Sequence, residues 1–152
     1  MINKQSKIYI AGHKGMVGSA CWKKLISHGY TNLIGKTFKD LDLRNQQLVM
    51  DFMSTEKPEA IIHCAAKVGG ILANSSSPYE FLMDNLLIQN NLIQSAFDYN
   101  VSKFIFLGSS CIYPKLCPQP ILEDYLMTGS LEPTNEAYAI AKISGLKLIE
   151  SL

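Results

Sequence analysis

The chain has 152 residues, 47% of them hydrophobic and 18% charged, which is enough for one soluble domain with its own core. Its formal net charge of +1 gives no electrostatic case for binding nucleic acid or an anionic membrane surface. No apolar run approaches the roughly 20 residues that span a bilayer, and the first run, 8–11, is too short for a signal peptide, so we expect a cytoplasmic protein.

Apolar and amphipathic segments alternate along the chain. In its first half they predict, in order, a buried strand at 7–11, a helix ending at His28 and Gly29, a strand at 33–37, a helix capped by Asp42, and a strand at 60–65. Residues 75–77, followed by Pro78, are predicted to be a loop. The second half predicts a long helix from Pro78, a strand at 103–107, a long proline-containing connection, and a helix over 137–152 capped by Thr134 or Asn135.

This alternation is typical of α/β proteins with right-handed crossovers and parallel strands. We therefore expect a Rossmann-like doubly wound parallel sheet with the strand order 3-2-1-4 and a ligand crevice at the carboxyl ends, between strands 1 and 4. Residues 1–152 would form one incomplete dinucleotide-binding domain, truncated after the fourth strand and the helix that follows it. The fourth strand would be an edge that a complete domain covers with further strands.

Four cysteines are scattered along the chain: Cys21, Cys64, Cys111 and Cys117. They form no C-x-x-C pair, and their spacing fits neither a zinc site nor a disulfide framework, so we expect no metal. Three of the four thiols are interpreted as small buried or half-buried hydrophobes, and Cys111 is set apart by its sequence context.

A glycine-rich turn follows the first predicted strand. Gly12, Gly15 and Gly18 form the pattern G-x-x-G-x-x-G between a strand and a helix. In dinucleotide-binding folds the first glycine permits the tight turn, the second admits the pyrophosphate, and the third lets the helix pack against the sheet. N–H groups at the helix N-terminus would bind the phosphates. A flexible loop without a ligand is the alternative, but the strand–turn–helix context favours a dinucleotide site.

Cations near this turn favour NADP(H) over NAD. An NAD site usually places an acidic residue at the end of the second strand, whereas this sequence has Lys-Thr-Phe-Lys at 36–39 and Lys14 in the turn. Positive charge suits the additional 2′-phosphate of NADP. Each lysine could equally be a solvated surface charge, and Lys14 is the strongest candidate because it lies in the turn. The sole arginine, Arg44, lies beyond this region, so no bidentate guanidinium contact is expected.

Tyr138 and Lys142 are four residues apart on the last predicted helix, so both side chains project from one face. An ammonium beside a phenol lowers the pKa of the tyrosine, which can then exchange a proton with an oxygen at a carbonyl carbon. The lysine can also hydrogen-bond the nicotinamide ribose. Ser109, at the end of the fourth strand, would direct its hydroxyl at the same substrate oxygen. A Y-x-x-x-K pattern alone is usually a pair of surface residues. Ser109, upstream at the carboxyl end of a predicted strand, favours a catalytic role for the pair.

Four segments carry a more specific pattern: 12–18 (GHKGMVG), 65–70 (AAKVGG), 108–114 (GSSCIYP) and 132–136 (EPTNE). Together they resemble the GDP-L-fucose synthase family of the extended short-chain dehydrogenases/reductases. The resemblance runs from about Ile8 to the last residue. GSSCIYP and AAKVGG discriminate far better than the generic reductase signature, which needs only the glycines, Ser, Tyr and Lys.

The resemblance implies NADPH-dependent conversion of GDP-4-keto-6-deoxy-D-mannose to GDP-L-fucose, with C3 and C5 epimerised before hydride reaches C4. It assigns Ser109, Tyr138 and Lys142 to the reductase triad and Cys111 to an acid/base role in the epimerisations. Without the resemblance, a packed hydrophobe is the better interpretation of Cys111. The residues implied to touch NADP(H) are Gly12, His13, Lys14, Gly15, Met16, Val17, Gly18, Leu107, Gly108, Ser109, Ser110 and Lys142. A homodimer of the full-length protein, built from helices at 78–99 and 137–152, is also implied, although the apolar stripes of these helices could equally be intramolecular core.

The sequence departs from the family in two ways. Some members carry arginine near the positions of Lys14 and Phe38, which makes the NADP preference less secure. Members are also roughly twice as long, so the partner histidine of the epimerisation and the domain that binds the GDP-sugar are expected downstream of Leu152. None of the three histidines present matches that residue, and His63, on a strand, is expected to be a satisfied core residue.

Three interpretations stay open. The chain represents a GDP-L-fucose synthase as a fragment or truncated product, another extended nucleotide-sugar 4-epimerase or 4,6-dehydratase, or a non-catalytic remnant. Cys111 followed by Ile-Tyr-Pro argues against the second, because a 4-epimerase needs no proton shuttle at C3 or C5. Residues 1–152 alone are expected to lack synthase turnover, because contacts that position the sugar would be missing, and to be poorly soluble, because a sheet edge and helix faces are uncovered.

Overall fold

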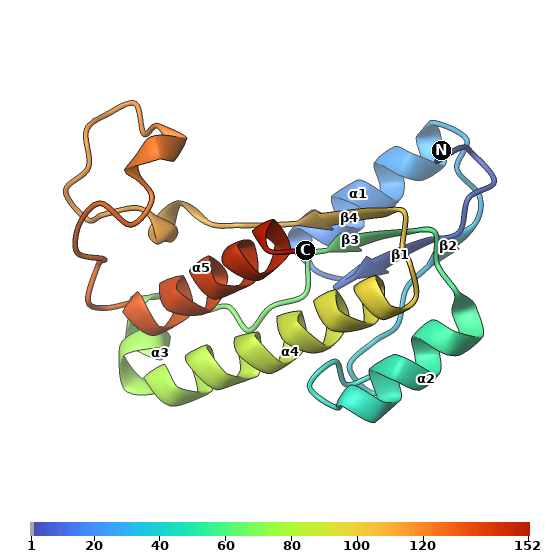
Figure 1. Ribbon diagram of the computed structural model, residues 1–152, viewed down its shortest axis with the longest axis horizontal. Coiled ribbons are helices and arrows are strands. Elements are labelled where there is room, and N and C mark those ends of the chain that lie inside the picture. The colour runs from blue at the N-terminus through green and yellow to red at the C-terminus, as the bar shows by residue number, and fades with distance from the viewer. Residues whose placement is uncertain (1) are drawn as a thin grey trace. The chain divides into compact units, whose positions relative to one another are not determined.

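The computed structural model describes residues 2–152, which cluster into two compact units. The first unit comprises the chain up to Ala66 together with Leu87–Leu107, and the second comprises Lys67–Leu86 and Gly108–Leu152. The long helix α4 (Pro78–Asp98) contributes residues to both units (Figure 1). Within residues 2–152, no helix is both long and apolar enough to cross a lipid bilayer.

The first unit is a parallel sheet with helices. Its elements are β1 (Ile8–Ala11), α1 (Met16–Ser27), β2 (Leu33–Ile34), α2 (Gln46–Glu56), β3 (Ala60–His63), the later part of α4, and β4 (Lys103–Phe106). The four strands are all parallel, in the order β2-β1-β3-β4. The predicted α/β class and parallel sheet are therefore confirmed, and β4 lies at an edge of the sheet as expected.

The predicted strand order 3-2-1-4 is wrong. β3 pairs with β1 along its whole length, from Ile8↔Ala60 to Ala11↔His63, and separates β1 from β4. β2 forms a ladder of only two residues, whereas β1 offers a fully buried four-residue edge, so the third strand pairs with β1 instead. The strand order consequently reverses between β1 and β3. Ligands of such sheets bind at the carboxyl ends of the strands at this reversal, which is the position of Gly12.

Side chains of β1 alternate between two cores. Tyr9 and Ala11 belong to a buried cluster with residues of α2 and α4, among them Phe52. Ile8 and Ile10 belong to a second cluster, packed against α1. Figure 1 shows α1 and α2 on opposite faces of the sheet. Because both faces of β1 are covered, the strand is an uninterrupted apolar run rather than an alternating one.

Two boundaries in the first unit differ from the prediction. β2 ends at Ile34 rather than at residue 37, because the backbone N–H and hydroxyl of Thr37 both donate to the Asp40 carboxylate and close a turn. The N-cap of α2 is Asn45, whose side chain accepts from the N–H of Leu48 at 3.1 Å. Asp42, the predicted cap, instead accepts a hydrogen bond from the N–H of Arg44 at 3.0 Å.

The second unit contains α3 (Ile71–Ser76), the first part of α4, the short 3-10 helices η1 (Ser110–Ile112) and η2 (Glu123–Tyr125), and α5 (Glu136–Glu150). The N-cap of α5 is Asn135, one of the two predicted. The prediction of a loop at 75–77 is wrong for Ser75 and Ser76, which end α3. Serines and a glycine pair concealed this helix, which is stabilised by the Asn74 amide donating to the carbonyls of Gly69 and Gly70.

Burial of Tyr9 predicts a loss of stability at alkaline pH. Tyr9 is 1% exposed, its ring centroid lies 4.6 Å from that of Phe52, and burial raises the pKa of its phenol above the ordinary value. Above about pH 10 the unfolded chain releases a proton that folded Tyr9 retains, so the free energy of unfolding falls as pH rises, by about 1.4 kcal/mol per pH unit. We expect Tyr9→Phe to remove this part of the slope, measured by urea unfolding at several pH values. Tyr79→Phe, at an exposed tyrosine, is the control, and equal slopes for both variants would contradict the prediction.

Candidate active site

The predicted phosphate-binding turn connects β1 to α1. Gly12 has φ = +80°, and a Cβ there would lie 2.8 Å from the backbone nitrogen of Ala65, just beyond β3. A Cβ at Gly18 would overlap the carbonyl oxygen of Gly12. Glycine at position 12 therefore lets the turn lie against the residues that follow β3. Glycine at position 18 lets the first turn of α1 lie against the backbone of Gly12. The N–H of Gly15, the N-cap of α1, donates to the Gly12 carbonyl at 2.9 Å and closes the turn.

The first turn of α1 is suited to an anion. α1 begins at Met16, and the first N–H groups of a helix have no acceptor within it. The first turn contains no acidic residue, so the positive end of the helix dipole is not neutralised by a neighbouring side chain. Gly15, Met16, Val17 and Gly18, all predicted to contact the cofactor, lie where a phosphate would be stabilised.

His13 packs between the turn and the end of β2. A Cβ at Gly35 would overlap the His13 ring, and the ring centroid lies 5.6 Å from that of Trp22. Nδ1 of His13 is buried and has no hydrogen-bond partner among the described residues. These contacts give His13 a packing role, and its contact with a cofactor stays a prediction.

Lys14 and Lys36 both act on the Asp40 carboxylate. Hydrogen bonds from the side chain and then the backbone of Thr37 hold the pKa of Asp40 below its usual range, and the charges of Lys36 and Lys14 act in the same direction. Lys36 also pairs with Glu56, with Nζ 3.9 Å from Oε1. The turn and the segment after β2 thus bring two cations near one carboxylate. A cofactor 2′-phosphate would find positive charge here.

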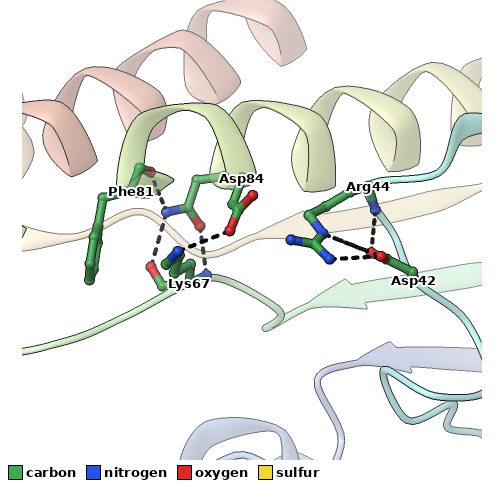
Figure 2. A network of polar contacts seen from close by, with 6 residues as sticks. Asp42, Arg44, Lys67, Phe81 and Asp84 are labelled. Atoms are coloured by element: carbon green, nitrogen blue, oxygen red, sulfur yellow. Dashed lines mark hydrogen bonds and ion pairs between the residues drawn. The ribbon is translucent and has the colours of Figure 1, made fainter. Parts of the chain in front are cut away.

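Arg44 is closer to the segment after β2 than the sequence indicated. Its guanidinium carbon lies 5.0 Å from the centroid of the Phe38 ring. The guanidinium also pairs bidentately with Asp42, with Nε 3.0 Å from Oδ1 and Nη2 2.9 Å from Oδ2 (Figure 2). This pairing lowers the pKa of Asp42 and explains why that carboxylate does not cap α2. In the sequence, the feature that could have indicated this contact is Phe38, an aromatic residue a few positions before the Asp-x-Arg pattern at 42–44.

All four predicted catalytic side chains lie in the second unit. Ser109 is the N-cap of η1, and its Oγ lies 2.7 Å from Sγ of Cys111 and 3.4 Å from the Cys111 nitrogen. α5 packs against η1 and brings Tyr138 close enough to Cys111 and Ser109 for both to act on the pKa of its phenol. Lys142 is 4% exposed, and its Nζ lies 5.9 Å from the centroid of the Tyr138 ring. The structure therefore brings Ser109, Cys111, Tyr138 and Lys142 together.

The pKa of Tyr138 is raised, not lowered as expected. Partial burial is the largest cause, the charge of Cys111 is the next, and the hydrogen bond with Ser109 acts in the opposite direction. The expected lowering of this pKa is wrong for this structure, because the effect of burial dominates the shift. A phenol that keeps its proton at neutral pH can serve as an acid.

A polar cluster around Lys67 was missed in the sequence (Figure 2). The buried Asn85 amide pairs with the Lys67 backbone in both directions, accepting from its N–H at 2.8 Å and donating to its carbonyl at 3.0 Å. Nζ of Lys67 lies 3.1 Å from the Asp84 carboxylate. A Cβ at Gly69 would lie 2.9 Å from the Phe81 ring, so that residue permits close packing. These contacts hold the AAKVGG segment against the start of α4. The feature of the sequence that could have indicated this cluster is the pair Asp84 and Asn85 within the apolar pattern of a helix, because a buried amide needs hydrogen-bond partners.

Three further residues predicted to contact the cofactor follow β4, and His63 and the cysteines complete the residues singled out in the sequence. Leu107 directly follows β4 and is the last residue of the first unit. Gly108 and Ser110 are exposed and lie at the start of the later segment of the second unit. The contacts of all three residues with a cofactor stay predictions. His63 is buried against Phe104 and Phe106, which confirms its place in the core but not the predicted hydrogen-bond satisfaction of its ring. The four cysteines are half-buried and form no disulfide, and within residues 2–152 no three His, Cys, Asp or Glu side chains gather as a metal site would require.

Comparison with known proteins places this geometry in context. The model of the NAD dependent epimerase/dehydratase family matches residues 8–152. The chain is 56% identical over 151 residues to GDP-L-fucose synthase 1 of Arabidopsis thaliana, covering 99% of this chain and 47% of that protein. It is 48% identical over 147 residues to GDP-L-fucose synthase of Escherichia coli (strain K12), covering 97% of this chain and 46% of that protein.

A solved structure is also similar. The GDP-mannoheptose C4 reductase MlghC from Campylobacter jejuni, with NADP bound, superposes with a TM-score of 0.96 at 42% identity, covering 99% of this chain and 48% of that one. The chain thus spans about half the length of the relatives that it matches.

Proposed function

Because the chain belongs to the NAD dependent epimerase/dehydratase family, we propose that it supplies the cofactor-binding part of a GDP-L-fucose synthase. Such an enzyme converts GDP-4-keto-6-deoxy-D-mannose to GDP-L-fucose. Two relatives at 56% and 48% identity carry that name, which supports the proposal. The single observation that carries it is the cluster in which the Ser109 hydroxyl lies 2.7 Å from the Cys111 thiol where α5, with Tyr138 and Lys142, packs against η1, because this reaction needs an acid/base at carbon as well as an acid at oxygen.

The cofactor in this proposal is NADP(H). The residues present fit a dinucleotide, since Gly12 and Gly18 leave room for a tight turn and the first turn of α1 has no acidic side chain. Lys14 and Lys36 would supply positive charge for the 2′-phosphate. When bound, NADPH supplies the hydride for C4. The bound NADP of the Campylobacter jejuni reductase supports this choice.

In the reduction, residues of this chain would supply the proton that the substrate oxygen O4 accepts. Tyr138 keeps its proton because burial and the nearby Cys111 raise the pKa of its phenol. It would donate that proton to the substrate oxygen as negative charge develops there, while the Ser109 hydroxyl donates a hydrogen bond to the same oxygen. The buried Lys142 ammonium over the Tyr138 ring compensates the phenolate that this transfer leaves.

In the epimerisations, Cys111 would exchange protons at C3 and C5. Both carbons are adjacent to the C4 carbonyl, so removal of either proton leaves an electron pair that delocalises onto O4. The hydroxyls of Ser109 and Tyr138 would stabilise that oxygen by hydrogen bonding. A second acid/base group on the opposite face of the sugar is required, because inversion needs the proton to return from the other side.

Incubation of the full-length protein with GDP-4-keto-6-deoxy-D-mannose and NADPH tests the proposal. We expect NADPH to be oxidised and deuterium from heavy water to appear at C3 and C5 of the product. Failure to oxidise NADPH with this sugar would end the proposal. Oxidation without deuterium would instead favour a GDP-sugar C4 reductase, a second candidate suggested by the similarity to the Campylobacter jejuni enzyme. A homodimer and a cytoplasmic location belong to the same proposal.

Cys111→Ser should separate the two reactions. We expect deuterium incorporation at C3 and C5 to fall about 10²- to 10⁴-fold, because a hydroxyl is a far weaker base than a thiolate, while binding of NADPH is retained. Mass spectrometry of the product measures the exchange. Cys117→Ser is the matched control, because Cys117 is another free, half-buried cysteine of the second unit. Exchange at the parent rate in Cys111→Ser would remove Cys111 from this role.

A further inference from the structure

The connection between η1 and α5 is closed by contacts between its two ends. The N–H of Lys115 donates to the Ser130 carbonyl at 2.9 Å. The Lys115 ammonium pairs with the Glu132 carboxylate, with Nζ 2.8 Å from Oε2. A Cβ at Gly129 would lie 3.3 Å from Cβ of Pro114, so glycine at position 129 lets the two ends lie side by side. The loop between these contacts therefore leaves and returns at one place, as an Ω-loop does.

Glu132 also organises the turn that begins α5. Its Oε1 accepts from the N–H of Thr134 at 3.3 Å and from the Thr134 hydroxyl at 3.2 Å. The N–H of Asn135, the N-cap of α5, donates to the Glu132 carbonyl at 3.1 Å. Hydrogen bonds from Lys115 and then from the N–H of Thr134 hold the pKa of the Glu132 carboxyl below its usual range, so this group is ionised at neutral pH. Glu132 therefore connects Lys115 to the N-terminus of α5.

The ion pair connects two of the segments that resemble the family. Lys115 directly follows GSSCIYP, which contains Cys111, and Glu132 is the first residue of EPTNE, which precedes Tyr138 of α5. α5 itself packs against η1. The ion pair thus lies shortly after the thiol and shortly before the phenol in the chain, and it joins the segments that carry them.

We propose that Lys115 and Glu132 are positioning residues, whose ion pair holds the end of η1 in register with the start of α5 and so fixes Cys111 relative to Tyr138. This role rests on the proposed function, in which the thiol acts at carbon and the phenol at O4 of one bound sugar. Two groups that act on neighbouring atoms of one substrate must keep a fixed separation, and a misplacement of about 1 Å can cost about 10²-fold in rate. The ion pair keeps motions of the loop from being passed on to η1 and α5.

The exposure of this pair separates a positioning role from a stabilising one. The side chains of Lys115 and Glu132 are 53% and 33% exposed, and an ion pair in water contributes little to global stability. Variants at these positions should therefore keep nearly the parent midpoint of urea unfolding. The pair of Lys147 with Glu150, near the other end of α5, is a matched control, because Nζ also lies 2.8 Å from Oε2 and both side chains are 50% exposed.

Amide hydrogen exchange of the full-length protein, followed by mass spectrometry, tests the positioning without sugar or NADPH. The N–H groups of Ile112 and Tyr113 donate to carbonyls at the start of η1, both at 3.3 Å. In Glu132→Gln we expect exchange in peptides that cover η1 to quicken about 3- to 10-fold, although the substitution lies at the other end of the loop, because local opening of η1 becomes easier. Lys115→Met should quicken exchange at the start of α5 by a similar factor. Lys147→Met should leave both segments at the parent rate.

Turnover by the full-length protein tests what the register means for the reaction. In Lys115→Met and in Glu132→Gln we expect single-turnover oxidation of NADPH with the keto sugar to slow about 10-fold, while NADPH affinity changes by less than about 2-fold. The double variant should be no slower than either single variant, because both substitutions break one interaction. Lys115→Arg, which keeps the charge, should retain the parent rate.

Four results would overturn the positioning role. They are parent exchange in η1 of Glu132→Gln, equal quickening in Lys147→Met, parent turnover in both single variants, and losses that add in the double variant. If the parent enzyme does not turn over the keto sugar, the proposed function fails, and the exchange measurement by itself still decides whether the ion pair holds η1 in register with α5.

Discussion

Tyr138→Phe should abolish most of the reduction at C4 while leaving NADPH bound. The phenol is the acid that the substrate oxygen needs as hydride arrives, and loss of a positioned general acid costs about 10²- to 10⁴-fold in rate. The phenol is half-buried, so removal of its hydroxyl should lower the free energy of unfolding by only about 1 kcal/mol. Single-turnover oxidation of NADPH by the full-length protein with the keto sugar measures the first effect.

A matched tyrosine separates chemistry from packing. Tyr125 lies in η2 of the same unit and is also half-buried, and Tyr125→Phe should retain the parent rate. NADPH affinity, measured by fluorescence titration, should change by less than about 3-fold in both variants. A Tyr138→Phe enzyme that still reduces the sugar at the parent rate would show that another group supplies the proton.

Gly12→Ala should strongly destabilise the fold and abolish binding of the cofactor. The residue has φ = +80°, and the new Cβ would meet the backbone of Ala65 at 2.8 Å. A strained backbone costs about 1–3 kcal/mol, and overpacking against atoms that cannot move costs about 1–3 kcal/mol more. We expect the free energy of unfolding to fall by about 3 kcal/mol or more and NADPH binding to be lost, measured by urea unfolding and by calorimetric titration.

Gly70→Ala is the control for this substitution. Gly70 has φ = −71°, and a Cβ there would have no neighbour within 4 Å. The change should cost at most about 1 kcal/mol and leave NADPH binding unchanged. Equal stability of the two alanine variants would mean that the turn does not approach β3 as closely as the geometry indicates.

Features that depend on neighbouring residues were predictable. The turn at Gly12–Gly18 was identified because a buried strand, three spaced glycines and a helix occur together within a short segment, and these preferences act locally. Three of the four predicted strands, β1, β3 and β4, appear close to their expected bounds for the same reason, as do α1, α4 and α5. The pairing of Tyr138 with Lys142 follows from helical spacing.

Features that depend on the choice among several possible polar partners were not predictable in this way. Asp42 has the right residue type for an N-cap, but Arg44 occupies its carboxylate and Asn45 caps α2 instead. The Lys67 backbone is paired by Asn85, which is 18 residues further along the chain. Spacing alone does not indicate which of several suitable partners a polar group will choose.

The sequence by itself therefore determined the class of fold, the position of the dinucleotide turn and the identity of the residues available for catalysis. Only the tertiary structure decided that β3 lies beside β1, that the pKa of Tyr138 is raised, and that the Ser109 hydroxyl lies against the Cys111 thiol. The physical reason is range: backbone preferences and side-chain spacing act over a few residues, whereas strand pairing, burial and hydrogen-bond allocation depend on which distant segments the folded chain brings into contact.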